Sequence, residues 1–175
     1  MNTECTIVAG GPSLRSFDWA SLRGKDVIAI NNSAFRLPDA RHIYFANRDW
    51  FERWEPELRQ VSGQVHQGVS GEEQWVNRPW VRRWNFEPRG KFTLAPGHIH
   101  GGCCSGNAAI NLAAQLGYTS LHLLGYDFNM SGNFHNDHAW TNPQPELWLR
   151  RFNEMLPDLE RHGIQIKSGA PEPYG

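Results

Sequence analysis

Short runs of apolar, β-type residues alternate along the chain with stretches in which apolar residues recur at helical spacing. The runs predict strands over residues 5–9, 26–30, 42–46, 92–95, 121–124 and 164–167. Small and apolar residues at helical spacing predict helices over residues 105–116 and 148–159. Ser105 would cap the first of these helices, and Pro157 would kink the second. This alternation is typical of a parallel sheet covered on both faces, so a single three-layer α/β domain with a mostly parallel sheet is expected over residues 1–175.

The segment 48–89 differs in composition from the rest of the chain and is expected to form a helical insertion or lid. It contains five tryptophans interleaved with arginines, namely Trp50, Trp54, Trp75, Trp80 and Trp84. Seven arginines against seven acidic residues leave the segment neutral, which disfavours a nucleic-acid groove. Trp50, Trp54 and Leu58 lie one helical turn apart, so a stripe packed on the core explains them. Pro56 would split this helix in two. A lid over a bound acceptor is the alternative.

The charge and the cysteines narrow the class of protein. Seventeen basic and eighteen acidic residues give a formal net charge of −1, which disfavours nucleic acid as a partner. Cys103 and Cys104 are adjacent and Cys5 lies apart, a pattern that fits neither a zinc site nor a disulfide framework. A reducing cytoplasmic location is therefore expected. No membrane span is expected, because no long apolar run occurs. The sequence does not determine the oligomeric state, and a homo-oligomer is one possibility.

A glycine-rich turn follows the first predicted strand, in the run Thr6-Ile-Val-Ala-Gly-Gly-Pro-Ser-Leu14. Gly10 and Gly11 have no Cβ atom, so a phosphate group could approach their backbone closely. Pro12 suits the first turn of a helix, and the hydroxyl of Ser13 would cap that helix. A strand that ends in such a turn is typical of nucleotide sites in open α/β sheets. The turn is therefore predicted to bind a nucleotide, although its spacing differs from the G-x-G-x-x-G signature.

Polar residues follow several other predicted strands or begin a predicted helix. They are Asn31, Asn32, Asn47, Tyr126 and Asp127 after strands, and Ser105, Gly106 and Asn107 at a helix start. The carboxyl ends of parallel strands meet at one edge of a sheet, so these residues are expected to share a pocket with the glycine-rich turn. For any single residue of this set, the alternative is ordinary turn chemistry.

The segment after Asp127 contains His135, Asp137 and His138. Their spacing resembles part of the His-x-His-x-Asp-His run of metallohydrolases, but Asn133 stands where the first histidine would be. No metal site is therefore predicted. A histidine that acts as general acid or base is favoured instead, because imidazole titrates near neutral pH. The alternative is that these histidines only shape the loop.

Together these motifs resemble a known superfamily. The Gly-Gly-Pro-Ser-Leu turn, the Asn-Asn pair, the run Ser105-Gly-Asn-Ala-Ala-Ile-Asn-Leu112 and the run Leu124-Gly-Tyr-Asp127 look like the MptE-like 6-hydroxymethylpterin diphosphokinase and motility-accessory superfamily. The resemblance covers residues 6–167 and is closest to the small phage-encoded branch, with its His-rich segment and Asn-Pro after a Tyr-Asp strand end. This superfamily shares a Rossmann-like fold with the family 42 glycosyltransferases, which are sialyltransferases. The resemblance implies a Rossmann-like, nucleotide-dependent transferase.

Family 42 implies a sugar-nucleotide donor held around the glycine-rich turn. The positions that match its donor site are Gly11, Pro12, Ser13, Asn31, Asn47, Ser105 and Gly106. By order along the chain, His138 matches the catalytic histidine. The sequence departs from the family at Gly10, where the family has asparagine, and at Tyr126, where the family places two tyrosines near the departing phosphate. Sugar transfer is therefore expected, and the donor sugar can be one other than sialic acid.

The pterin kinases imply a different reaction, the transfer of pyrophosphate from ATP with magnesium. In that reaction Asp127 would help to hold the ion and act as a catalytic residue. Sugar transfer is favoured over pyrophosphate transfer. A non-catalytic, nucleotide-binding accessory protein of a phage is the third hypothesis. The sequence identifies neither the donor base nor the acceptor.

Overall fold

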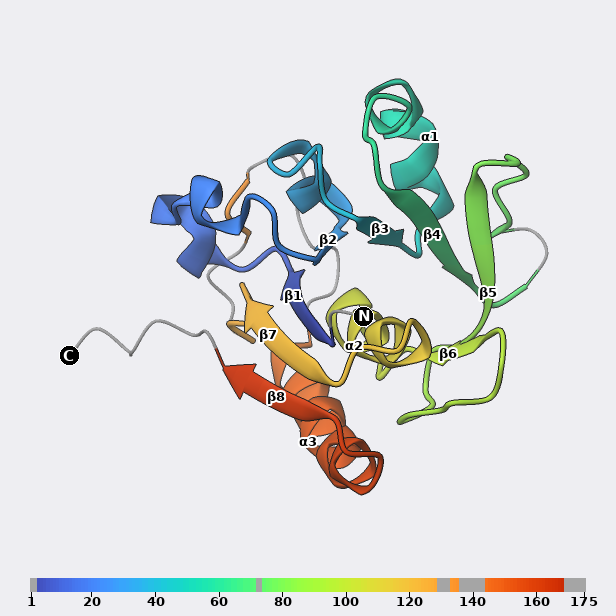
Figure 1. Cartoon of the computed structure of the whole chain (residues 1–175). Coiled ribbons are helices and arrows are strands. Elements are labelled where there is room, and N and C mark those ends of the chain that lie inside the picture. The colour runs from blue at the N-terminus through green and yellow to red at the C-terminus, as the bar shows by residue number, and fades with distance from the viewer. Residues whose placement is uncertain (1–2, 72–73, 129–132, 136–143, 169–175) are drawn as a thin grey trace.

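The computed structural model describes residues 3–71, 74–128, 133–135 and 144–168 of the chain. At its centre lies a sheet of eight strands in the order β6-β5-β4-β3-β2-β1-β7-β8, in which all neighbouring strands are parallel (Figure 1). The strands are β1 (Glu4–Val8), β2 (Val27–Ile30), β3 (His42–Phe45), β4 (Gln64–Val69), β5 (Val81–Glu87), β6 (His98–His100), β7 (Ser120–Leu124) and β8 (Gln165–Ser168). The predicted α/β fold with a parallel sheet is confirmed.

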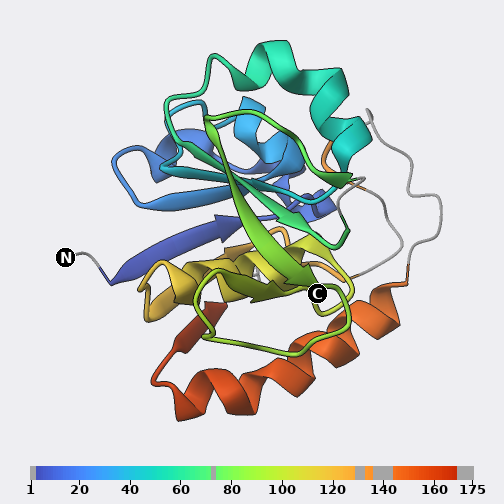
Figure 2. The same ribbon diagram turned by 90° about the vertical axis from the view of Figure 1, so that its right-hand side faces the viewer.

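Helices cover both faces of this sheet (Figure 2). One face carries α2 (Ser105–Gln115) and α3 (Pro145–Arg161), and the other carries α1 (Arg48–Leu58) with the 3-10 helices η1 (Pro12–Ser16), η2 (Trp19–Leu22) and η3 (Asn31–Phe35). Successive strand residues point to opposite layers, so Ile28 and Ile30 pack in the core with α2, whereas Val27 and Ala29 pack in the core with α1. The central strands β1, β2 and β3 are mostly apolar because both of their faces are covered.

The expected helical insertion over residues 48–89 is wrong beyond α1. The helix α1 runs on through Pro56, and the chain then forms β4 and β5, which are interior strands of the sheet. The apolar pattern does not reveal β4, because His66 and Gln67 are polar and yet fully buried in it. The amide of Gln67 forms hydrogen bonds of 2.7 and 3.0 Å with backbone groups of the following loop. A strand tolerates buried polar groups that are satisfied in this way.

The strand predicted over residues 92–95 is also wrong. This stretch is a loop whose backbone is hydrogen-bonded by side chains of α2. The amide of Asn111 accepts from the N–H of Thr93 at 3.2 Å and donates to its carbonyl at 2.7 Å, and Gln115 donates to the carbonyl of Ala95 at 2.8 Å. Helix side chains thus replace a neighbouring strand as partners of this backbone.

The helix α3 is longer at both ends than its predicted range of 148–159. It spans 17 residues, contains Pro157, and buries Met155 and Leu159. Within the described part of the chain, no helix combines the length and the apolar character needed to cross a membrane.

A chain of polar side chains lies in the core on the α2 side of the sheet. The Nε1–H of Trp84 donates to Nδ1 of His66 at 3.0 Å, so His66 carries its proton on Nε2. This Nε2 lies 3.0 Å from Nδ1 of His42, whose Nε2 lies 3.4 Å from the hydroxyl of Tyr118. That hydroxyl donates to Asp26 at 3.3 Å. Burial is the main cause that lowers the pKa of His42 to about 4 and the pKa of His66 to about 3, so both imidazoles are neutral.

Acid is expected to destabilise the protein through these two histidines. In the unfolded chain each would titrate near pH 6.5, above its pKa in the fold. A lowered pKa gives stability that is complete above the unfolded pKa and is lost as the pH falls towards the folded value. The free energy of unfolding should therefore fall by about 2–4 kcal/mol between pH 6.5 and pH 4.5. Urea unfolding at a series of pH values measures this loss.

His66→Gln is the informative variant, because glutamine can accept from Trp84 and donate to His42. It should reduce the loss of stability in acid by roughly half, since one of two titrating groups is removed. His98→Gln, at an exposed position, should leave the loss unchanged. A wild-type stability that is flat between pH 6.5 and pH 4.5 would contradict this account.

Candidate functional site

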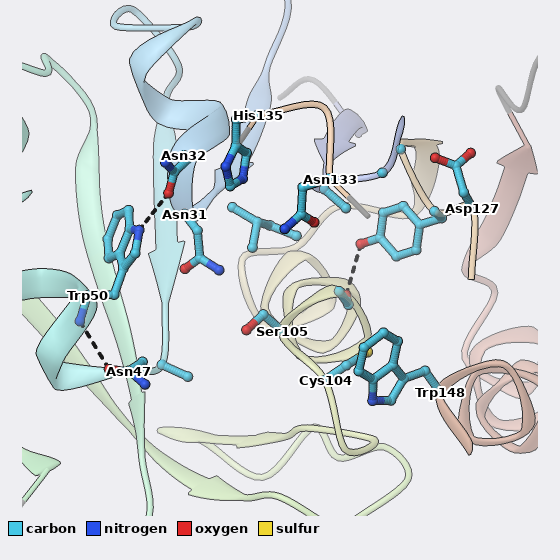
Figure 3. Close-up of a pocket in the computed structure, with 18 of the residues that line it drawn as sticks. Asn31, Asn32, Asn47, Trp50, Cys104, Ser105, Asp127, Asn133, His135 and Trp148 are labelled. Carbon is cyan, nitrogen blue, oxygen red and sulfur yellow. Dashed lines mark hydrogen bonds between the residues drawn. The ribbon is translucent and has the colours of Figure 1, made fainter. Parts of the chain in front are cut away.

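A cavity of about 580 Å³ opens at the carboxyl ends of β1, β2, β3 and β7 (Figure 3). Its position follows from the strand order, because the chain moves outward from β1 to β6 on one side and returns to β7 on the other side of β1. In open α/β sheets the connections diverge at such a reversal and leave a crevice, where ligands bind. The cavity is therefore the candidate functional site.

Ten of the residues predicted for the site line this cavity. They are Gly10, Gly11, Pro12, Asn31, Asn32, Asn47, Ser105, Gly106, Tyr126 and Asp127. Ser13 and Asn107 do not line it. His138, the predicted catalytic histidine, and its neighbour Asp137 lie outside the described residues. The expectation that the strand ends form one pocket with the glycine-rich turn agrees with this geometry.

The glycine-rich turn is fastened to the chain that follows β7. The N–H of Gly11 donates to the carbonyl of Gly125 at 2.9 Å, and the N–H of Ser13 donates to Oδ2 of Asp127 at 3.0 Å. A Cβ atom on Gly11 would lie 2.0 Å from Oδ2 of Asp127 and 2.4 Å from the Gly125 carbonyl oxygen. Gly11 is therefore required by close packing of the protein on itself, and Asp127 positions the turn.

The predicted helix cap at Ser13 is wrong. The helix after the turn is the 3-10 helix η1, its N-cap is Gly11, and no side chain caps it. The serine lies inside the first turn, so its backbone N–H and not its hydroxyl makes the bond to Asp127.

Asn31 offers its side chain to the cavity. It begins η3 with a φ of 50°, a left-handed conformation that asparagine adopts more readily than most residues. In the described part of the chain its amide forms no hydrogen bond. Figure 3 shows the amide pointing into the cavity towards Ser105. Asn31 is therefore placed to donate to and accept from a bound ligand.

The other two asparagines also organise α1. Oδ1 of Asn47 accepts from the N–H of Trp50 at 3.0 Å and caps the helix. Oδ1 of the buried Asn32 accepts from Nε1–H of Trp50 at 2.7 Å. Both asparagines line the cavity, but each has one amide oxygen committed to the scaffold.

The start of α2 faces the cavity from the opposite side. Its N-cap is Cys104, whose Sγ accepts from the N–H of Asn107 at 3.4 Å, so the predicted cap at Ser105 is wrong. Ser105 is instead the first helical residue, and its hydroxyl points into the cavity. Burial raises the pKa of the Cys104 thiol to about 11, so it stays protonated. The positive end of the α2 dipole and the hydroxyl favour an anion here.

Tyr126 closes this wall against α2. Its hydroxyl donates to the carbonyl of Gly106 at 2.9 Å, and a Cβ atom on Gly106 would lie 3.0 Å from the ring. Burial raises the pKa of Tyr126 far above its ordinary value, so the hydroxyl keeps its proton. The ring forms part of the cavity wall, and its hydroxyl is committed to Gly106.

Asn107 supports the wall from behind. It is fully buried, and its Nδ2 donates to the carbonyls of Gly102 and Trp148 at 3.0 and 3.1 Å. The bond to Trp148 joins α2 to α3, and the Trp148 side chain lies at the cavity beside Cys104. Asn107 is thus a positioning residue of the scaffold.

Several cavity residues were not predicted from the sequence. They are Asp49, Arg53, Trp50 and Trp54 of α1, together with Cys103, Cys104, Phe128, Asn133 and Trp148. The tryptophans were assigned to the core by their helical spacing, and they do pack on it. The signal available in the sequence was their place directly after Asn47, which begins α1 at the cavity.

The short segment that contains His135 lies over the glycine-rich turn. The N–H of Phe134 donates to the carbonyl of Gly10 at 2.9 Å, and a Cβ atom on Gly10 would lie 3.1 Å from Oδ1 of Asn133. His135 lines the cavity next to these residues. Of the two histidines considered from the sequence, His135 therefore lies at the site, and His138 is outside the described residues.

No three histidine, cysteine, aspartate or glutamate side chains among the described residues are grouped so that they could hold a metal ion. Among the described residues, the charged groups that line the cavity are the carboxylates of Asp49 and Asp127 and the guanidinium of Arg53. Asp127 lies beside the glycine-rich turn, whereas Asp49 and Arg53 lie on α1.

The fold and the cavity define a Rossmann-like α/β protein with a ligand-sized cavity at the reversal of its strand order. A solved structure with this fold is the sialyltransferase CstII from Campylobacter jejuni in complex with the substrate analogue CMP-3FNeuAc. The TM-score is 0.62, the alignment covers 98% of this chain and 82% of that chain, and 14% of residues are identical. This likeness shows a shared fold. No family model matches the sequence, and no curated protein sequence matches it. The resemblance to the MptE-like superfamily and its phage branch therefore stays a prediction.

Proposed function

We propose that the protein is a glycosyltransferase that uses a sugar nucleotide as donor. The observation that carries this proposal is the cavity at the reversal of the strand order, lined by the glycine-rich turn, Asn31 and the start of α2. A Rossmann-like fold shared with a sialyltransferase that was solved with CMP-3FNeuAc supports the same class of reaction.

The walls of the cavity suit the parts of such a donor. The start of α2, with the Ser105 hydroxyl, favours the negative charge of the nucleotide phosphate. The amide of Asn31 can form hydrogen bonds with polar groups of the nucleoside. Asp127 does not need to touch the donor, since it holds the turn through Ser13. In this arrangement the donor lies across the ends of β1, β2 and β7.

Transfer also needs a group that accepts the proton of the acceptor hydroxyl. As that oxygen attacks the anomeric carbon, the bond to the nucleotide phosphate breaks and the phosphate leaves with the electron pair. His135 lines the cavity and can accept the proton. His138, which matches the family histidine by order along the chain, stays a prediction.

Nucleotide binding tests the proposal. Wild type is titrated calorimetrically with CMP, UDP, GDP and ATP, each with and without magnesium. Asn31→Gly removes the amide without straining the backbone, since glycine accepts the φ of 50° at this position. It should weaken binding by about 1–3 kcal/mol, because ligand polar groups lose their partner, while thermal stability is kept.

Asn47→Ala serves as the comparison, since it also removes the cap of α1. This variant should weaken nucleotide binding, and it should also lower the free energy of unfolding by about 1 kcal/mol. Normal binding by both variants would remove the asparagines from the donor site. Binding of ATP alone, and only with magnesium, would favour pyrophosphate transfer instead.

A further inference from the structure

One wall of the cavity lies away from the glycine-rich turn and consists of Asp49, Trp50, Arg53 and Trp54, which we call the α1 wall. It follows the end of β3, which is separated from β1 by β2. Two strand spacings amount to about 10 Å, so a phosphate bound beside the turn and α2 would not reach this wall. Figure 3 shows Trp50 and Asn47 on one side of the cavity, with Asp127 and Trp148 on the other side.

The aromatic part of the α1 wall is fixed in place. The indole N–H of Trp50 is bonded to Asn32 at 2.7 Å. The ring of Phe35 packs on both tryptophans, with its centroid 6.0 Å from Trp50 and 5.0 Å from Trp54. Both indoles are only partly buried and line the cavity. The wall therefore presents preformed apolar ring surface, which suits the C–H face of a sugar.

Arg53 differs from Arg48 and Arg59, which also lie on or next to α1. Arg48 pairs with Glu52 at 2.7 Å, and Arg59 pairs with Glu55 at 2.8 Å. The guanidinium of Arg53 forms no ion pair or hydrogen bond with any residue that the structure describes, and instead lies 5.2 Å from the ring centroid of Trp54. Carboxylates stand four residues before and after it on the helix, at Asp49 and Glu57, and it pairs with neither. A cation held on an aromatic ring at the cavity edge is ready to bind an anion.

We propose that the α1 wall is the acceptor subsite, and that it recognises a saccharide with a negatively charged group. The guanidinium of Arg53 binds the carboxylate or phosphate of that saccharide. The indoles of Trp50 and Trp54 support its ring, and the carboxylate of Asp49 accepts hydrogen bonds from its hydroxyls. This assignment rests on the proposed function, since it places the acceptor in the same cavity as the donor.

Direct binding tests the assignment without turnover. Glucuronate, glucose 6-phosphate and glucose are titrated into wild type, Arg53→Gln and Arg48→Gln, with thermal melting as the check of folding. Wild type should bind at least one of the two anionic sugars about tenfold more tightly than glucose. The preference for glucuronate or for glucose 6-phosphate identifies carboxylate or phosphate as the charged group.

Arg53→Gln should abolish this discrimination, so that its affinity for the anionic sugar equals its affinity for glucose. Arg48→Gln, which loses the exposed ion pair with Glu52, should discriminate as wild type does. Nucleotide affinity should be the same in all three proteins.

Three results would overturn the assignment. They are a wild type that does not prefer the anionic sugars, an Arg53→Gln variant that keeps the preference, and a tenfold loss of nucleotide affinity in Arg53→Gln. A failure of the proposed function gives a different result. Wild type then binds no nucleotide, but it still prefers the anionic sugars, and Arg53→Gln still lacks this preference.

Discussion

Gly11→Ala is expected to destabilise the protein by about 3 kcal/mol and to abolish nucleotide binding. The added Cβ atom would lie 2.0 Å from Oδ2 of Asp127 and 2.4 Å from the carbonyl oxygen of Gly125. The φ of Gly11 is −65°, which alanine adopts freely, so the whole cost comes from crowding. Relief requires the turn to separate from the chain after β7, which breaks the bond from Gly11 to Gly125 and opens the cavity. Denaturant unfolding and calorimetric titration measure the two effects.

Gly24→Ala is the matched control, because at Gly24 the backbone conformation is strained for alanine while the space for a Cβ atom is open. Gly24 has a φ of 74° and nothing within 4 Å of an added Cβ atom. It should cost about 1 kcal/mol through backbone strain and leave nucleotide binding unchanged. A loss below 1 kcal/mol in Gly11→Ala would show that the turn can move away from β7 at little cost.

His135→Ala is expected to lower turnover by about 10²–10⁴, once a donor and an acceptor are in hand. The reason is that the imidazole takes up the acceptor proton in the transition state, when the acceptor oxygen attacks. Donor affinity should change little, because His135 acts on the reacting hydroxyl and not on the nucleotide. Turnover at saturating substrate and the dissociation constant of the donor separate these two properties.

His138→Ala is the comparison for this prediction. If His135 is the base, His138→Ala should turn over near the wild-type rate. The opposite ranking would transfer the role to His138, as the family order along the chain implies. Wild-type turnover in both variants would end the assignment of a histidine base in this segment.

The general architecture could be predicted because it depends on apolar periodicity. Strands such as β2 and β3 are covered on both faces, and their sequences are accordingly runs of apolar residues. The shared pocket at the strand ends could also be predicted, since parallel strands bring their carboxyl ends to one edge. Its residues were found because polar residues follow several strands at once, although any one of them alone would be ordinary turn chemistry.

The parts that could not be predicted depend on long-range hydrogen bonds. The strand β4 holds His66 and Gln67 in the core, and only partners elsewhere in the chain make that acceptable. The loop over residues 92–95 has strand-like residues, but Asn111 satisfies its backbone. The place of Arg53 could not be predicted for another reason: the sequence alone would pair it with a carboxylate on its own helix, whereas its guanidinium lies over the ring of Trp54.

The link between the glycine-rich turn and the end of β7 determines when the cavity can form. Ser13 and Asp127 are 114 residues apart, and the bond from Gly11 to Gly125 spans the same distance. During synthesis the turn therefore has no partner until most of the chain has emerged, and such distant pairing is slow. The nucleotide of the proposed function would therefore find no binding site during the early steps of folding. It would stabilise only the completed sheet, so the cell's nucleotide pool would act on the lifetime of the folded protein and leave the rate at which it forms unchanged.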